Sequence, residues 1–327
     1  MAYIELIAGL IVLVIAGDIL VRGSVAIAQK LGVPTLVIGL TLVAFGTSAP
    51  ELVVGIDAVL TGAPNLALGN VVGSNIANVL LVVGIPAMIL PAATNLPKLG
   101  RNIGFMLGAS VIVIGLSFTG AVTFWNGVVL TGLLLAFLLY SARPSRPLKP
   151  AAAAAEHLEA EHTLADADLL SDIDLESSAQ LPSWRAALYI IAGLAGLIFG
   201  ADWLVSGAVT IARSLGVSEA VIGLTLVAVG TSLPELVTGI AAAIHKHNDV
   251  ALGNVLGSNI FNLLGILGIT SLVGDLPVPA SFLAVDLWVM LGAALLIVPP
   301  YLMKRDIGRL YGFGLVVLYV VYLVYLT

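Results

Sequence analysis

Two short segments of this sequence place a carboxylate next to hydroxyl-bearing residues inside long apolar stretches. One reads Gly-Thr-Ser-Ala-Pro-Glu and ends at Glu51, and the other reads Gly-Thr-Ser-Leu-Pro-Glu and ends at Glu235. A carboxylate enclosed by hydrocarbon is costly unless it meets a partner or water. Each segment supplies one negative charge and several neutral oxygens, the hard ligands that Na⁺ and Ca²⁺ prefer. The two segments therefore predict a cation site.

Proline explains how further oxygens become free in each segment. It has no N–H, so the carbonyl four residues earlier loses its helical partner. Positions three and four apart share a helix face, which brings that carbonyl and the hydroxyls near the glutamate. The expected kink residues are Gly46, Pro50, Gly230 and Pro234, and the hydroxyl-bearing residues are Thr47, Ser48, Thr231 and Ser232. A plain helix kink at an interface is the alternative for one copy, but two copies with glutamate favour the cation site.

A second pair of segments shares the pattern Gly-Asn-x-x-Gly-Ser-Asn-Ile-x-Asn. The first runs from Gly69 to Asn78 and the second from Gly253 to Asn262. Serine and asparagine four residues apart present a hydroxyl and an amide on one stripe of a helix, and the Gly-x-x-x-Gly spacing lets another helix approach closely. Hydrogen bonding between helices is the competing role, mainly for Asn70 and Asn75. The expected ligands are Ser74, Asn78, Ser258 and Asn262.

These segments belong to an internal repeat with a constant offset. Asp18 and Asp202, Glu51 and Glu235, and Asn78 and Asn262 are each separated by 184 residues, with no gap. The chain therefore divides into a first repeat at 1–142, a linker at 143–183 and a second repeat at 184–327. Asp18 and Asp202 also repeat, and we expect each near a helix end, in contact with water or a hydrogen-bond donor.

The composition requires a membrane environment. The 327 residues are 60 % hydrophobic and 10 % charged, and the mean hydropathy is +1.12. A soluble domain of this size needs a more polar exterior, whereas a spanning helix needs about 20 apolar residues. About ten such helices are expected, five in each repeat, at 3–21, 35–60, 66–90, 102–119, 123–141, 185–205, 219–244, 250–273, 282–302 and 310–326. The fold class is an all-α integral membrane protein.

The two repeats are expected to lie in opposite orientations. Five helices in each half reverse the direction of the second half, and inverted repeats of this kind are typical of secondary transporters. With the N-terminus outside, twelve of the thirteen Lys and Arg residues fall on the inner side, and Arg213 alone falls outside. The positive-inside rule thus favours both termini outside and a cytoplasmic, acidic and flexible linker.

The paired segments resemble the two α-repeats of the cation/calcium antiporter superfamily, specifically prokaryotic sodium/calcium exchangers. The resemblance covers nearly the whole chain outside the linker. It implies alternating access and cation ligation by the residues named above, together with the backbone carbonyls of Ala44 and Ala228. Some members carry Asp where this sequence has Asn262. Two neutral asparagines therefore leave the Na⁺:Ca²⁺ stoichiometry open and argue mildly against K⁺ dependence.

The expected function is exchange of Na⁺ for Ca²⁺ across a bacterial or archaeal inner membrane. A H⁺/Ca²⁺ exchanger, a K⁺-dependent Na⁺/Ca²⁺ exchanger and, from another class, a cation channel are the alternatives. No enzymatic activity and no cofactor is expected, because the sequence lacks cysteine and a zinc-binding His motif. The expected partners are the lipid bilayer and the transported cations, with no nucleic acid.

Overall fold

The structure of the chain is a computed structural model that describes residues 1–33, 35–141, 181–216 and 228–326. Eight described helices are long and apolar enough to cross a membrane, and a bent helix pair over residues 35–60 raises that number to nine. The fold class is thereby confirmed as an all-α membrane protein. Most of the expected linker and the start of the helix expected at 219–244 lie outside the described residues.

The first half contains the five expected hydrophobic segments, and π-helical turns, which are named η here, subdivide several of them. Its elements are α1 (Ala2–Leu31), α2 (Thr35–Ile38), η1 (Gly39–Val43), α3 (Ala44–Thr47), α4 (Ala49–Leu60), α5 (Pro64–Ala77), η2 (Asn78–Val83), α6 (Gly84–Ile89), α7 (Leu99–Ser117), β1 (Ala121–Val122) and α8 (Phe124–Ser141).

The second half follows the same plan in its described part. Its elements are α11 (Ser183–Ser214), α13 (Ala228–Thr231), α14 (Leu233–Ile244), α15 (Asn248–Ile260), η4 (Phe261–Ile266), α16 (Leu267–Val273), β2 (Leu276–Pro277), η5 (Phe282–Asp286), α17 (Leu287–Leu295), α18 (Val298–Leu302) and α19 (Arg309–Leu326).

The first helix of each half is longer than expected. Charge at Asp18 and Arg22 does not end α1, because the two side chains form an ion pair at 2.9 Å one helical turn apart. The helix instead ends at Gly32, which takes the left-handed conformation. Asp18 and Asp202 thus lie well inside α1 and α11, so the expectation that they sit near helix ends is wrong. Asp18 also contacts His245, in the α14–α15 loop.

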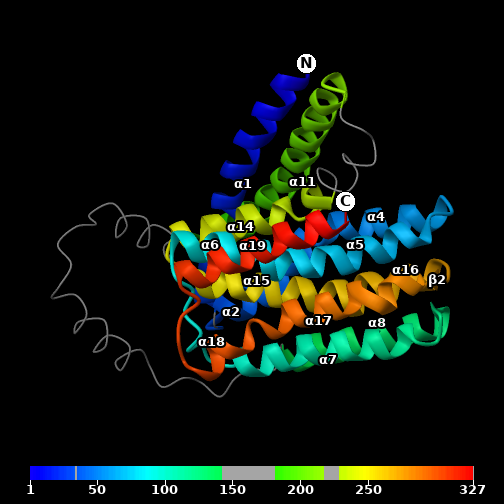
Figure 1. The fold of residues 1–327 in the computed structure, drawn as a ribbon. Helices are drawn as coiled ribbons and strands as arrows, with labels where there is room; N and C mark the ends of the chain where they lie inside the picture. Colours follow the sequence, from blue (N-terminus) through cyan, green and yellow to red (C-terminus); the bar gives the residue numbers. More distant parts are fainter. Residues whose placement is uncertain (34, 142–180, 217–227, 327) are drawn as a thin grey trace.

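Helices α1 and α11 project together from the main bundle and run antiparallel (Figure 1). Gly9 near the start of α1 faces Gly200 and Leu204 late in α11, whereas Gly23 late in α1 faces Ala186 near the start of α11. Because α1 and α11 are equivalent elements of the two repeats, their antiparallel packing supports an inverted relation between the halves.

Two short backbone pairings join the halves at opposite ends of the bundle. In the ribbon β1–β2, Val122 pairs with Leu276, and at the far end Ala92 pairs with Ile307 through two hydrogen bonds of 3.0 and 2.9 Å. In each pairing, the loop before the fourth spanning helix of one half contacts the loop after the fourth spanning helix of the other half. Figure 1 shows β2 at one end of the bundle and α18, which precedes Ile307 in the chain, at the other end, as an inverted repeat requires.

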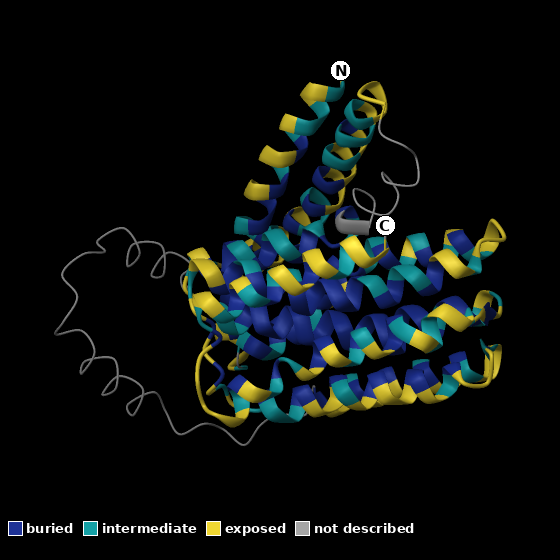
Figure 2. Ribbon diagram, in the orientation of Figure 1, coloured by how far each residue is buried: buried dark blue, intermediate teal, exposed yellow. Residues whose placement is uncertain are grey.

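The centre of the bundle is formed by the third spanning helix of each half. In the most apolar stretch of the helix over Asn248–Val273, 89 % of residues are buried, against 17 % for Arg309–Leu326 at the periphery. Figure 2 shows this buried centre, with exposed residues on the outer faces of the surrounding helices. Many of the exposed side chains are large and apolar, as a lipid-facing surface requires.

The α1–α11 contact predicts a selective effect of added volume. A Cβ atom at Gly9 would lie 2.7 Å from the carbonyl oxygen of Gly200, whereas one at Gly115 on α7 would meet no described atom within 4 Å. We expect Gly9→Val to destabilise the protein by about 1–3 kcal/mol through overpacking, and Gly115→Val to have little effect. Thermal unfolding in detergent measures both, and equal melting temperatures for the two variants would contradict this packing.

Candidate cation site

Each of the two glutamates occupies the first turn of a helix that begins after a break. The chain bends by 40° between α3 and α4, and Ser48 at the break has φ −83° and ψ 3°. Glu51 follows in the first turn of α4, with Pro50 at the helix start; Ser232, Pro234 and Glu235 repeat this arrangement at the start of α14. The expected bend is therefore present, but the helix expected over 35–60 is interrupted at Ser48.

The helix break changes the electrostatic setting of the carboxylates. The first turn of a helix presents unpaired N–H groups and a partial positive charge, which stabilise a nearby anion. Pro50 suits that position, since its missing N–H would have no intrahelical partner there. Glu51 and Glu235 are nevertheless fully buried. Their charges lie close enough to repel each other.

The hydrogen bonds around the glutamates are only partly symmetric. The Ser48 hydroxyl donates to Glu235 Oε1 at 3.4 Å, so a residue of the first repeat contacts the carboxylate of the second. The equivalent hydroxyl of Ser232 has no hydrogen-bond partner among the described residues. One compact site therefore draws on both halves of the chain.

A second pair of contacts follows the repeat closely. The Thr47 hydroxyl donates to Asn254 Oδ1 at 3.3 Å, and the Thr231 hydroxyl donates to Asn70 Oδ1 at 3.4 Å. Asn70 also directs its amide to the carbonyl of Glu51, at 3.5 Å. The two asparagines hold the threonines of the opposite repeat in place. The sequence predicts that Asn70 forms hydrogen bonds between helices. It also offered a signal for Asn254 that was not used, because Asn254 is the equivalent of Asn70 in the second repeat.

The expected amide ligands lie at two π-helical turns. Asn78 is the first residue of η2, and Asn262 is the second residue of η4. The Asn262 amide donates to the Ser74 hydroxyl at 3.0 Å, and the Asn78 amide donates to Asn259 Oδ1 at 3.1 Å. In both asparagines the Oδ1 atom is buried with no partner in the described chain. Short π-helical turns inside α-helices often mark functional sites.

The backbone carbonyls implied by the resemblance lie at the same breaks. The Ala44 carbonyl accepts the N–H of Ser48 at 3.0 Å and lies 3.4 Å from the Thr47 hydroxyl. Ala228 begins α13 at the equivalent place in the second half. The Ser48 N–H also points toward the Gly46 carbonyl. The Gly46 oxygen is therefore less available to a cation than the missing N–H of Pro50 predicts.

The unpartnered polar atoms at this site are almost all oxygens. Buried polar groups normally have hydrogen-bond partners, so a cluster without them needs an explanation. The unpartnered oxygens of the site residues are Glu51 Oε1 and Oε2, Glu235 Oε2, Asn78 Oδ1, Asn262 Oδ1, Ser232 Oγ and Ser258 Oγ. A hard cation would satisfy several of these acceptors at once.

The donor set does not resemble a transition-metal centre. Within the described ranges, no three His, Cys, Asp or Glu side chains gather in a group that could hold a metal ion. The site instead combines two carboxylates with hydroxyl and amide oxygens. This chemistry suits Na⁺ and Ca²⁺ better than Zn²⁺ or Cu²⁺, which prefer nitrogen and sulfur ligands.

The fold defines a multi-pass membrane protein with two homologous halves, and the oxygen-rich cluster between them is a candidate cation site. Residues 1–143 and 185–327 match the family model described as sodium/calcium exchanger protein, and the chain belongs to that family.

Similar proteins agree with this assignment. The sodium/calcium exchanger MaX1 of Methanosarcina acetivorans is 34 % identical over 346 residues, covering 99 % of this chain and 98 % of that protein. The inner membrane protein YrbG of Escherichia coli is 32 % identical over 272 residues, covering 82 % of this chain and 78 % of that protein. A structure of the sodium-calcium exchanger NCX_Mj soaked with zero Na⁺ and Ca²⁺ superimposes with a TM-score of 0.82 at 32 % identity, covering 100 % of this chain and 99 % of that one.

The buried charges predict how the stability of the protein responds to Ca²⁺. Two unpaired buried carboxylates destabilise the fold unless a cation neutralises them. We expect the double variant E51Q/E235Q to melt at a higher temperature than wild type in cation-free buffer at pH 8, and to lose the rise in melting temperature that Ca²⁺ gives wild type. A Ca²⁺-induced rise of wild-type size in this variant would place the ion elsewhere.

Proposed function

We propose that this protein is a sodium/calcium antiporter that binds its ions in turn between Glu51 and Glu235. The observation that supports this most directly is the pair of fully buried carboxylates, surrounded by unpartnered oxygens contributed by both repeats. The proposed ligands are the two glutamates with Thr47, Ser48, Ser74, Asn78 and Ala44, and their equivalents Thr231, Ser232, Ser258, Asn262 and Ala228. MaX1 and NCX_Mj carry the name of sodium/calcium exchanger, which agrees with this choice of ions.

Charge balance couples the two ion fluxes in this proposal. The site holds two carboxylates, and the asparagines at 78 and 262 are neutral, so one Ca²⁺ or two Na⁺ cancels its charge. An empty or overcharged site is costly to enclose away from water. The change of access is then favourable mainly for a neutral, loaded site, which makes Ca²⁺ and Na⁺ compete for one cavity. Inverted halves provide the two access states by exchanging their local conformations.

The alternatives differ in what drives Ca²⁺ movement. A H⁺/Ca²⁺ exchanger would use the same glutamates as proton acceptors and would transport without Na⁺. A K⁺-dependent exchanger would need K⁺ together with Na⁺, and neutral asparagines at 78 and 262 disfavour an extra cation. A channel would pass cations without coupling, and it has no need of two inverted halves. The Na⁺/Ca²⁺ assignment is the one that fits the donor set and the family together.

The proposed orientation places both termini outside and the segment 143–183 in the cytoplasm of an inner membrane. Contacts at one end of the bundle support it: Lys30 Nζ lies 3.4 Å from the Ser183 hydroxyl, and the basic residues Lys304 and Arg305 adjoin the Ala92–Ile307 pairing. Arg213 lies at the opposite end of α11, the end that packs beside the start of α1. The basic residues thus gather at the end where the segment leaves and re-enters the bundle.

Transport measurements test the site directly. In proteoliposomes with Na⁺ inside and ⁴⁵Ca²⁺ outside, we expect E51Q and E235Q each to abolish uptake, because each removes half of the charge that Ca²⁺ requires. Asp57 lies on the exposed side of the same helix as Glu51, so D57N is the matched control and should retain wild-type uptake. Imposed H⁺ or K⁺ gradients separate the exchanger types. Full uptake by E51Q would contradict the site, and uptake driven by a pH gradient without Na⁺ would contradict Na⁺ coupling.

Labelling of single cysteines tests the orientation. The chain has no cysteine, so one introduced residue reports its own side of the membrane. In right-side-out vesicles, a membrane-impermeant maleimide should label Ala2→Cys at once and should label Ser145→Cys only after permeabilisation. The reverse pattern would show that the chain inserts the other way round.

A further inference from the structure

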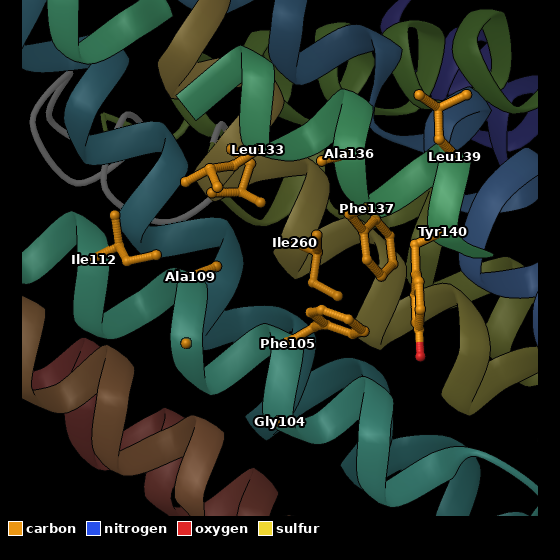
Figure 3. A pocket seen from close by; sticks show the side chains of 12 residues that line it. Gly104, Phe105, Ala109, Ile112, Leu133, Ala136, Phe137, Leu139, Tyr140 and Ile260 are labelled. Atoms are coloured by element: carbon orange, nitrogen blue, oxygen red, sulfur yellow. The ribbon is translucent and has the colours of Figure 1, made fainter. Parts of the chain in front are cut away.

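An apolar groove lies on the outer side of the first repeat, between α7 and α8 (Figure 3). Phe105 and Ile112 of α7 and Phe137 of α8 form its walls, and Ile260 and Leu264 from the second repeat lie at its base. Its volume is about 660 Å³, within the range of about 300–1,000 Å³ found for small-molecule sites.

Two glycines of α7 keep this groove open. Gly104 and Gly108 both line it, and a Cβ atom added at either position would meet no described atom within 4 Å. Flanking side chains on the same helices are exposed and apolar, including Val111 and Leu139. The groove therefore faces the hydrocarbon of the bilayer, and its natural occupant is apolar.

A second groove lies at the equivalent place in the other half, between α17 and α19. Gly292, Val289 and Val321 line it, and the repeat offset maps them onto Gly108, Phe105 and Phe137. Leu80 takes the place of Leu264 in the lining, and the volume is about 550 Å³. The repeat thus provides an internal comparison of two similar grooves.

The two grooves differ in charge at one end. Arg101, in the first turn of α7, lies over the ring of Tyr140 with Cζ 5.2 Å from the ring centroid, and Tyr140 lines the first groove. Arg101 donates to the neutral Asn102 side chain at 3.3 and 3.2 Å, and among the described residues no ion pair joins it to a carboxylate. The equivalent residue of the second groove is Val285.

We propose that the α7–α8 groove binds one anionic phospholipid, with its phosphate at Arg101 and an acyl chain along Phe105 and Gly108. A guanidinium at the end of an apolar channel matches the two chemically distinct parts of such a lipid, since arginine binds phosphate well and the groove accepts hydrocarbon. The second groove accepts an acyl chain but lacks the cation, so it shows no preference for an anionic headgroup.

This lipid would lie against the ion-binding helix. Leu264 at the base of the groove belongs to η4, two residues after Asn262. The occupied groove supports the π-helical turn that carries Asn262 from the side opposite the ions. The lipid site itself does not depend on which cations the protein exchanges.

Lipid retention tests the proposal in the full-length protein. The protein is reconstituted in vesicles of equal dioleoylphosphatidylglycerol and dioleoylphosphatidylcholine, extracted gently and examined by native mass spectrometry. Wild type should retain phosphatidylglycerol over phosphatidylcholine by about fivefold, the effect of one cation near a membrane surface. Arg101→Gln should bring that ratio close to one, and Gly108→Phe should lower the amount of phosphatidylglycerol retained.

The equivalent substitution in the other groove, Gly292→Phe, is the matched control and should leave the phosphatidylglycerol preference at its wild-type value. Inorganic phosphate should not displace the retained lipid, because it lacks the acyl chain. Equal retention of the two lipids by wild type, unchanged preference in Arg101→Gln, or equal loss in Gly108→Phe and Gly292→Phe would overturn the proposal. Arg101→Gln changes a half-buried residue at a helix end, so it keeps the test valid if Gly108→Phe does not fold.

Discussion

Two glutamates placed side by side in a protein interior lose their hydration and repel each other, and this cost shapes the architecture around them. A soluble protein would normally expose such residues or pair each with a basic side chain. Here each carboxylate instead lies in the first turn of a short helix, where N–H groups favour negative charge. In the proposed function, a bound cation offsets the remaining electrostatic cost, and the same features that make the empty site unfavourable make it selective for positive ions.

Close helix packing brings the neutral oxygens to these charges. Gly253 and Gly257 let α15 approach the backbone of the segment containing Leu36 and Leu40, and this contact brings Asn254 within reach of Thr47. Small residues at such crossings are typical of membrane helices, which associate through packing because lipid provides no hydrophobic driving force. The π-helical turns add a second adjustment, because they change the direction in which Asn78 and Asn262 point relative to a regular α-helix.

The sequence predicts the membrane class, the repeat and the composition of the candidate site, because all three are expressed in local residue types and their spacing. It predicts helix ends less well. Asp18 looked like a boundary, but Arg22 pairs with it one turn later and α1 continues to Leu31. Likewise, proline alone does not distinguish a kink from a new helix start, which depends on how the neighbouring helices pack at Ser48. Contacts such as Ser48 with Glu235 combine residues far apart in sequence, so spacing within one segment cannot reveal them.

The antiparallel packing of α1 against α11 implies a two-fold axis lying in the plane of the membrane. If the two halves were identical, the outward-open and inward-open forms would have equal free energy, since rotation about that axis converts one into the other. Any preference for one form must therefore come from positions where the repeats differ. Such positions are few near the site, and they include Ala77 opposite Phe261 and Ala49 opposite Leu233. These mismatched pairs, rather than the ion ligands, set the resting bias of the transporter.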